Sequence, residues 1–294
     1  MTAATPLGHS FVMTTRRPAP RAEWSDLAER TEALAMQRMM LHQSPETAEL
    51  LGISAPALAD GVQTVVVRDP MWGYWNKALG FCSRVDEATV AEAVTRARDE
   101  RVASFAFQVQ PRAVPDDWSA VTRRHGLTQG TMFVKFFGPA EPRGAETGLR
   151  VRRLGAEDAA AFTQVLAVGF GFEETDDAHA LFDGPQYFGG DWAAYGAYDG
   201  DRLVAAARMV VVPETDAVSL FGAATLPEGR NRGAQGALLD ARLREARDRG
   251  IHYASAETWL ESEGNPNPSQ HNLRRAGLTE VHTRPSWVWQ AAES

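Results

Sequence analysis

Hydrophobic residues along the chain follow two spacings, one with the period of a helix and one typical of strands. From 22 to 42 apolar residues recur every three or four positions, whereas short β-branched runs elsewhere are bounded by Pro, Gly or Asp. In the first half we expect helices at 22–42, 44–60, 86–101 and 116–125, and strands at 62–68, 104–109 and 131–137. In the second half we expect helices at 156–169, before Gly250 and before Gly277, and strands at 149–154, 193–199, 202–212, 217–226, 251–259 and 281–289.

This mixture predicts an α/β fold in which mixed sheets are flanked by helices. A cluster of prolines and glycines between 139 and 148 separates the two halves. We therefore expect a flexible tail at 1–20, a first domain at 21–140, a linker at 141–148 and a second domain at 149–294.

The two halves also share short sequences in the same element order. The run Ala97-Arg98-Asp99 recurs about 150 residues later as Ala246-Arg247-Asp248. At nearly the same offset, Arg123-Arg124-His125-Gly126-Leu127-Thr128 recurs as Arg274-Arg275-Ala276-Gly277-Leu278-Thr279. The shared offset predicts a duplicated α/β unit.

Composition narrows the possible functions. The net charge of −8 and the pI near 5.4 argue against nucleic acid as a partner, because phosphate backbones need a basic surface. No run of about 18 apolar residues is present to span a membrane, and Arg16 and Arg17 follow rather than precede the apolar run of the tail. A single cysteine, Cys82, allows no internal disulfide, so we expect a cytoplasmic protein.

The stretch from Leu220 to Gly250 carries the clearest chemistry. A strand of small residues breaks at Pro227, and a loop with two arginines and two glycines leads into an amphipathic helix. Bare amides at a helix start, aided by the helix dipole, bind phosphate, and glycine lets it approach the backbone. Neither GxGxxG nor GxxxxGK[ST] is present. The counterpart in the first half, Leu79 to Glu87, has Asp86 and Glu87 at its helix entry, and these would repel phosphate.

The run Arg230-Asn231-Arg232-Gly233-Ala234-Gln235-Gly236-Ala237 resembles the acyl-coenzyme A loop of the GNAT acetyltransferases, R/Q-x-x-G-x-G/A, with Gln235 where Gly or Ala is usual. The later segment 265–278, in which Asn267 can cap a helix that begins at Pro268, resembles the last GNAT helix. The resemblance covers 149–290, and the first half resembles a degenerate copy. It implies two tandem GNAT-like domains, with one active site in the second.

The resemblance also implies roles for individual residues. The backbone of Asn231 to Ala237 would hold the pyrophosphate of acetyl-coenzyme A or another acyl-coenzyme A, and the strand before it would pair with pantetheine. The residues expected to bind the coenzyme are Ala223, Ala224, Thr225, Arg230, Asn231, Arg232, Gly233, Ala234, Gln235, Gly236, Ala237 and Asn272.

The places of several residues in the expected strands, loops and helix make them candidates for the catalytic acid and base. Glu257 near a strand end and Glu261 on the next loop could each accept the proton of the acceptor amine, and the alternative for each is a solvated carboxylate at a strand end. Leu273 stands where many GNAT enzymes place a proton-donating tyrosine, and His271 or Ser269 could substitute for it. His252 and His282 have no partners at metal-ligand spacing, so we expect no metal site.

Three functions agree with these features. The first is transfer of an acetyl or other acyl group to a small-molecule amine by direct attack in a ternary complex. The others are different chemistry on the same thioester, such as O-acylation or decarboxylation, and a non-catalytic coenzyme A sensor. Aromatic residues from both halves suggest a walled acceptor pocket, or simply packed cores: Trp72, Tyr74, Trp75, Phe182, Tyr187, Phe188 and Trp192.

Overall fold

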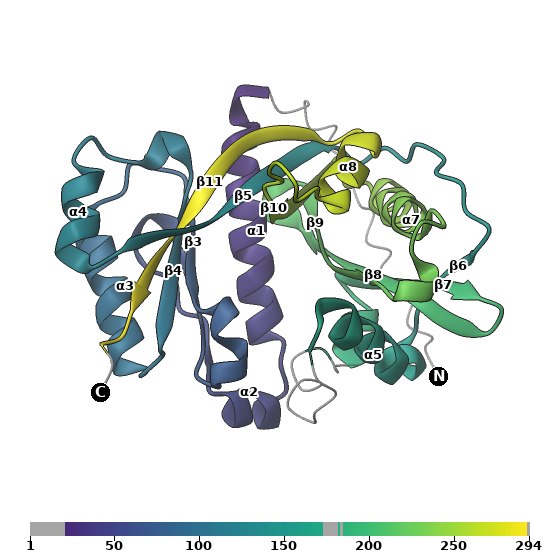
Figure 1. Ribbon diagram of the computed structural model, residues 1–294, viewed down its shortest axis with the longest axis horizontal. Coiled ribbons are helices and arrows are strands. Elements are labelled where there is room, and N and C mark those ends of the chain that lie inside the picture. Colours follow the sequence, from purple (N-terminus) through teal and green to yellow (C-terminus); the bar gives the residue numbers. More distant parts are fainter. Residues whose placement is uncertain (1–20, 173–181, 183–184, 293–294) are drawn as a thin grey trace, which may run out of the picture.

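The computed structural model describes residues 21–172, 182 and 185–292 of the 294-residue chain, so the predicted tail lies outside the described residues. These residues form one eleven-stranded mixed sheet with helices packed on both faces (Figure 1). The helices are α1 (Trp24–Leu41), α2 (Pro45–Leu51), α3 (Glu87–Asp99), α4 (Trp118–His125), α5 (Ala159–Phe170), α7 (Ala234–Asp248) and α8 (Pro268–Arg275). The strands are β1 (Ile53–Ser54), β2 (Gln63–Val67), β3 (Lys77–Phe81), β4 (Ser104–Val109), β5 (Thr128–Pro139), β6 (Arg150–Arg153), β7 (Trp192–Asp199), β8 (Arg202–Val212), β9 (Ala217–Thr225), β10 (Tyr253–Trp259) and β11 (Thr279–Gln290).

The two halves repeat the same order of elements. In the first half β3, α3, β4, α4 and β5 follow one another, and in the second half β9, α7, β10, α8 and β11 do the same. Within each set the first two strands pair in parallel, β3 with β4 and β9 with β10. The short repeated sequences lie at the ends of equivalent helices, so the element order agrees with the predicted duplication.

The halves are joined by an exchange of their last strands, which the sequence does not predict. The sheet order is β1-β2-β3-β4-β11-β5-β10-β9-β8-β7-β6. Strand β5 of the first half pairs with β10, whereas the end of β11 returns to pair with β4. The two long strands also pair with each other, and Figure 1 shows them crossing from one lobe to the other. Each half therefore completes the sheet of its partner.

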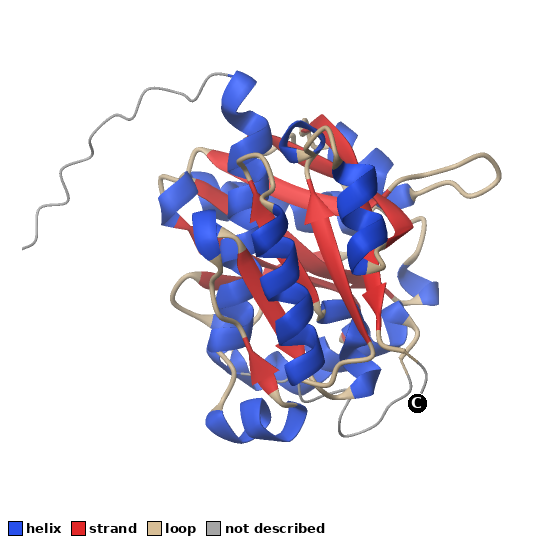
Figure 2. Ribbon diagram, turned by 90° about the vertical axis from the view of Figure 1, so that its left-hand side faces the viewer, coloured by secondary structure: helices blue, strands red, loops and turns tan. Residues whose placement is uncertain are grey.

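Helix α1 crosses the middle of this sheet (Figures 1 and 2). Its Trp24 packs against Phe137 of β5 and Tyr253 of β10, with ring centroids 5.8 and 6.3 Å apart. Its other end joins a core shared with the second half, in which Met39 is fully buried. Because apolar side chains of both halves meet on α1, this helix belongs to the contact between the lobes.

The aromatic stretch 71–75 lies mostly in a 3₁₀ turn, η3 (Pro70–Trp75). Trp72 is buried in the shared core and contacts Phe172 and Phe182 at 5.2 and 5.5 Å between ring centroids. Tyr74, in contrast, is 63% exposed. Of the two alternatives for the aromatic residues, a pocket wall or a packed core, Trp72 therefore agrees with the packed core. Among the described residues, no helix has both the length and the apolar character to cross a membrane.

Candidate functional site

Strands β9 and β10 separate in the middle of the sheet. Their parallel pairing runs from Ala217 and Tyr253 to Ser219 and Ser255 and then stops, although both strands continue. A bulge in β9 places Gly222, with φ of +54°, and Ala223 opposite one residue of β8. Beyond the bulge, Ala224 and Thr225 pair with β8 on one side, and no strand of the described residues pairs with the other edge, which we call the free edge of β9.

The chain then turns into α7 through the predicted phosphate loop. Asn231 and Gly233 adopt φ of +58° and +77°, a conformation that favours glycine and tolerates asparagine. Gly233 is the N-cap residue of α7, and no side chain caps the helix. The first amides of an α-helix have no partner within the helix, so those of the first turn from Ala234 are available to a ligand.

Gln235 reaches from α7 to the end of β9. Its side-chain amide donates hydrogen bonds to the carbonyl oxygen of Ala224 at 3.1 Å and to Oγ1 of Thr225 at 2.8 Å. Ala224 lies opposite Ala206 in a hydrogen-bonded pair, since two residues further on the amide of Leu226 donates to Val204, so the Ala224 carbonyl faces β8 and accepts from Gln235 as well. The residue that departs from the loop pattern therefore ties the start of α7 to the strand before the loop.

A cavity of about 590 Å³ lies beside this loop, between α7 and α8. It is lined by the loop residues Asn231, Gly233 and Gly236, by Asn272 of α8, and by the linker at Ala145 and Glu146. The linker is held here because Oδ1 of Asp240 accepts hydrogen bonds from the amides of Arg143 and Gly144 at 2.6 and 2.7 Å. A Cβ on Gly233 would lie 2.6 Å from the Glu146 carbonyl oxygen, so glycine also permits the linker to form this wall.

The two loop arginines differ in their surroundings. Arg232 makes a two-point ion pair with Asp199 at 2.6 and 2.9 Å, and this partner cancels much of its positive charge. Arg230 donates a long hydrogen bond of 3.4 Å to the carbonyl oxygen of Thr225. Its guanidinium has no carboxylate partner among the described residues, so Arg230 is the loop cation available to an anion.

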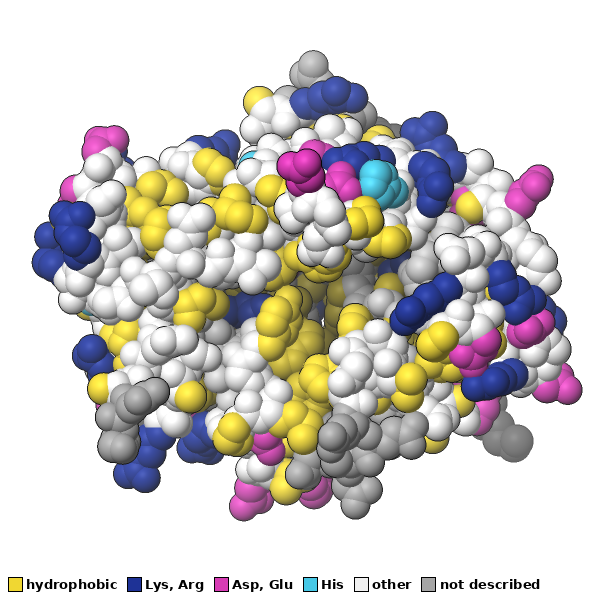
Figure 3. All heavy atoms as spheres, viewed as in Figure 1, with side chains coloured by type: hydrophobic (Ala, Val, Ile, Leu, Met, Phe, Trp, Pro, Cys, Tyr) yellow, Lys and Arg dark blue, Asp and Glu magenta, His cyan; other side chains and the backbone are white. Residues whose placement is uncertain are grey.

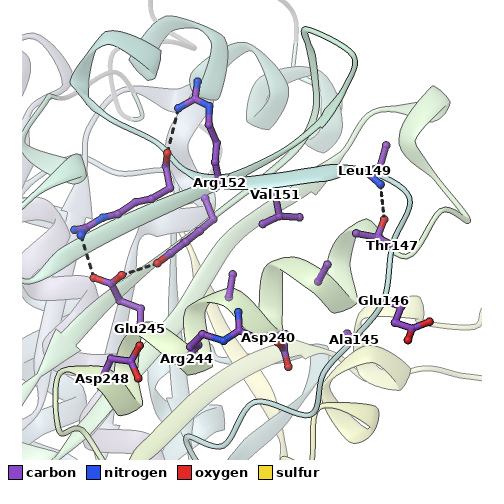
Figure 4. Close-up of a pocket in the computed structure, with 14 residues that line it drawn as sticks. Ala145, Glu146, Thr147, Leu149, Val151, Arg152, Asp240, Arg244, Glu245 and Asp248 are labelled. Atoms are coloured by element: carbon purple, nitrogen blue, oxygen red, sulfur yellow. Dashed lines mark hydrogen bonds and ion pairs between the residues drawn. The ribbon is translucent and has the colours of Figure 1, made fainter.

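A second cavity, of about 660 Å³, lies on the other side of the linker, between β6 and α7 (Figure 4). Four of its charged groups pair within the cavity lining: Glu245 with Arg153, and Asp240 with Arg244. Glu245 forms an ion pair with Arg153 at 3.2 Å and accepts a hydrogen bond from the hydroxyl of Tyr195 at 2.5 Å. Asp240 forms an ion pair with Arg244 at 2.6 Å. The smaller cavity is the better ligand site, because it adjoins the uncapped helix start.

Glu257 lies on β10 just past the point where β9 separates, inside a buried charge network. Its Oε2 is 2.5 Å from Nη2 of Arg284 and 3.1 Å from Nζ of Lys135. Two carboxylates of α1 complete the network: Glu29 contacts Nη1 of Arg284 at 2.5 Å, and Glu32 contacts both Nη2 of Arg284 and Lys135. Residues of both halves thus meet at Glu257.

The network separates the proton affinities of its carboxylates. Burial opposes ionisation of Glu257, but Arg284 and Lys135 outweigh it and hold the pKa of Glu257 well below its usual range. The pKa of Glu32 is raised by burial and by the nearby charge of Glu257. Two neighbouring carboxyl groups with opposite shifts are typical of acid–base sites. Glu257 therefore stays ionised, and Glu32 is the group of higher proton affinity.

The other two predicted catalytic residues contact each other away from this network. Nε2 of His271 lies 2.9 Å from Oε2 of Glu261, and Arg274 lies 3.0 Å from the other oxygen. The hydrogen bond from Arg274 is the largest cause of a lowered pKa at Glu261. Asn267 caps α8 and Pro268 begins it, as predicted. Leu273 is buried on the inner side of α8.

Figure 3 shows that the molecular surface is hollowed near the middle of one face, between the two lobes, with hydrophobic side chains around the hollow.

Lys77 of β3 is buried close to the charge network around Glu257. Its Nζ lies 4.0 Å from the ring centroid of Tyr74 and 5.7 Å from that of Trp75. Burial lowers the pKa of Lys77 to about 8, although Glu32 and Glu257 oppose this shift.

The equivalent loop of the first half has a different structure. Strand β3 pairs with β4 as far as Phe81 and Val109, so the two strands do not separate as β9 and β10 do. Asp86 caps α3 by accepting the amide of Ala88 at 3.1 Å. A negative side chain thus occupies the position where the second half has bare amides, in agreement with the predicted loss of a phosphate site.

Sequence reasoning missed the residues that surround Glu257. Lys77, Lys135 and Arg284 each lie in a strand, Lys135 between Val134 and Phe136, and Glu29 and Glu32 lie on a helix that is buried on most sides. An isolated charge inside an apolar strand was the available signal, because such a charge must find a partner within the fold.

A scan against protein families and a search of curated proteins each find no match for this chain. Solved structures match almost its whole length. A GCN5-related N-acetyltransferase from Kribbella flavida matches with a TM-score of 0.59 at 16% identity, over 90% of this chain and 96% of that one. A tandem GNAT protein from the clavulanic acid biosynthesis pathway matches with a TM-score of 0.57 at 13% identity, over 93% and 95%. A putative GNAT-family acetyltransferase from Novosphingobium aromaticivorans matches with a TM-score of 0.53 at 16% identity, over 91% and 99%. The predicted fold is confirmed: the chain has the fold of the GNAT acetyltransferases, in the tandem form of the second of these proteins.

Proposed function

We propose that this protein is an acyltransferase that moves an acetyl or other acyl group from acyl-coenzyme A to the amine of a small-molecule acceptor. The observation that carries the proposal is the free edge of β9 leading into an uncapped helix start. A phosphate group and an extended amide chain can be bound there together, which is what coenzyme A offers.

The proposed binding of the coenzyme uses the backbone more than side chains. The amide of Ala237, the last of those predicted, already donates to the carbonyl oxygen of Gly233 at 3.1 Å, so the amides from Asn231 to Gly236 hold the pyrophosphate and Arg230 adds positive charge. Pantetheine lies along Ala223 to Thr225, where the side chain of Gln235 now contacts Ala224 and Thr225. Asn272 and the linker border the cavity in which the remainder of the coenzyme lies.

The acceptor approaches the thioester from the side of the charge network. The Glu257 carboxylate, fixed by Arg284 and Lys135, attracts the ammonium group of the acceptor. Freeing an alkylamine of pKa near 10.4 at pH 7 costs about 4 to 5 kcal/mol, so a proton acceptor contributes to the rate. With its depressed pKa Glu257 accepts a proton poorly, and Glu32 takes it. Glu261 and His271 are the alternative pair, because they contact each other.

The thioester is cleaved without a covalent enzyme intermediate. The amine nitrogen attacks the carbonyl carbon, the carbon–sulfur bond breaks, and coenzyme A leaves as a thiolate. Leu273 is buried and apolar, so it supplies no proton. A thiol of pKa near 8.5 leaves readily, and water can protonate it at neutral pH.

The test is release of free thiol when acetyl-coenzyme A is mixed with a panel of small amines, with products identified by mass spectrometry. An acylated amine supports the proposal. Thiol release with an O-acyl or decarboxylated product would replace it with other thioester chemistry. Tight coenzyme binding without turnover across the panel would instead indicate a sensor.

A further inference from the structure

Arg208 of β8 is fully buried, and no carboxylate of residues 21–172 or 185–292 forms an ion pair with it. It stands in the apolar run Ala205-Ala206-Ala207-Arg208-Met209-Val210 and has 0% exposed surface. In the described part of the chain, its Nε and Nη1 atoms have no hydrogen-bond partner. The one hydrogen bond of its Nη2 to a described residue is to the sulfur of Met39 at 3.4 Å. Arginine keeps its charge at neutral pH, so this is a buried cation that has no oxygen partner among the residues described.

Four aromatic rings surround the guanidinium. Its central carbon lies 4.6 Å from the ring centroid of Tyr187, 4.9 Å from that of Phe221, 5.4 Å from Phe182 and 5.9 Å from Phe162. Aromatic rings attract a cation but offer no oxygen to its N–H groups. The four rings therefore hold the guanidinium in place while its Nε and Nη1 donors stay unused by the described residues. This arrangement favours an anionic ligand over a permanent structural role.

The position of Arg208 relates it to the proposed active site. In the register of the sheet it faces Phe221, next to the bulge at Gly222 and just beyond Ser219, the last residue of β9 that pairs with β10. Its side chain lies against Gly222, because a Cβ there would be 3.0 Å from Nε. It points to the α1 and α5 face of the sheet, since Met39 and Phe162 belong to these helices. Helix α7, at which the coenzyme enters, packs on the opposite face against Ala205 and Ala207.

We propose that Arg208 binds a carboxylate of the substrate, carried either by the acceptor amine or by the far end of a dicarboxylic acyl group. The carboxylate oxygens accept hydrogen bonds from Nη1 and Nη2, and the flexible Met39 side chain moves aside. This inference rests on the proposed acyl transfer and adds the class of substrate. It makes Arg208 a specificity-determining residue.

Two sets of matched ligands distinguish a carboxylate on the acceptor amine from a carboxylate on the acyl group. In the first, ω-amino acids from glycine to 6-aminohexanoate are compared with alkylamines of the same length, titrated calorimetrically into the complex with coenzyme A. In the second, succinyl-coenzyme A is compared with butyryl-coenzyme A, which lacks only the terminal carboxylate. We expect a carboxylate member of one set to bind about 10- to 100-fold more tightly than its match, as charged hydrogen bonds provide.

The variant Arg208→Met should lose this preference, and its melting temperature without ligand should equal or exceed that of the wild type, because an unpaired charge is removed. Arg202→Met, which alters an exposed arginine of the same strand, is the control and should keep the preference. If Arg208→Met does not fold, Arg208→Lys replaces it and should weaken carboxylate binding.

The inference is overturned if neither set shows a preference for the carboxylate, or if the preference survives in the Arg208 variant. Coenzyme A binding in the same titrations separates this failure from that of the proposed function. Binding of coenzyme A without a carboxylate preference rejects only the role of Arg208, whereas absence of coenzyme A binding rejects the acyl transfer itself.

Discussion

Arg284 connects all three carboxylates of the central charge network, so Arg284→Met is the sharpest perturbation of the site. Its guanidinium contacts Glu29, Glu32 and Glu257, each at 2.5 Å, and it is fully buried. With arginine gone, Lys135 is the remaining cation in direct contact with Glu32 and Glu257. Breaking one buried ion pair costs about 3 to 5 kcal/mol, and we expect a loss of at least that size near pH 8.

The loss should depend on pH with a definite sign. The pKa of Glu32 is already raised above 4.5 by burial and by Glu257, and removal of Arg284 raises it further. Above pH 4.5 the folded variant then binds more protons than its unfolded chain, so its free energy of unfolding falls as pH rises. The decrease is about 1.4 kcal/mol per pH unit for each extra proton, until the raised pKa is passed.

Urea unfolding followed by tryptophan fluorescence at pH 5 and pH 8 measures both effects. The variant should be much closer to wild type at pH 5 than at pH 8. Arg84→Met is the control, because Arg84 pairs with Asp116 at 2.8 Å on the surface, and such a pair contributes about 0 to 1 kcal/mol. A loss below about 1 kcal/mol at pH 8, or one that is equal at both pH values, would refute the reasoning.

Three further substitutions test other parts of the account. Gln235→Ala removes the side chain that is held against Ala224 and Thr225, where pantetheine is proposed to lie, so coenzyme A should bind about tenfold more tightly by calorimetry, and unchanged or weaker binding would contradict the competition. Asp240→Ala releases the linker amides of Arg143 and Gly144, so coenzyme A should dissociate about tenfold faster in stopped-flow experiments, and an unchanged rate would show that this wall does not retain the ligand. Trp72→Ala empties part of the shared core and should lower the free energy of unfolding by about 3 to 5 kcal/mol in urea; a loss below about 1 kcal/mol would mean that the two halves do not depend on this contact.

Local features were predictable because they depend on neighbouring residues. The bounds of β4 and β8 agree with expectation, since each is a short apolar run between turn residues. The turn before α8 followed from Asn267 and Pro268, whose capping and backbone preferences act over a few residues. For the same reason the loop from Arg230 to Gly236 could be recognised as a candidate phosphate site.

Long-range features were not predictable from the pattern. The exchange of β5 and β11 depends on which strand edges meet across the whole chain, and hydrophobic alternation gives no such partner. Glu29 and Glu32 look like the solvated face of a helix, and only the packing of α1 on the sheet buries them. Glu257 was singled out by position, but its partners Lys135 and Arg284 come from the exchanged strands.

The loop at the start of α7 is proposed to hold the coenzyme, and calorimetric titration of coenzyme A tests this binding directly. We predict one binding site per chain, lost in Gly233→Glu, which adds a carboxylate at the loop and a Cβ 2.6 Å from the Glu146 carbonyl oxygen. Gly126→Glu, at a positive φ in open space, is the matched control and should bind normally. No heat with the wild-type chain, or equal binding by Gly233→Glu, would contradict the account.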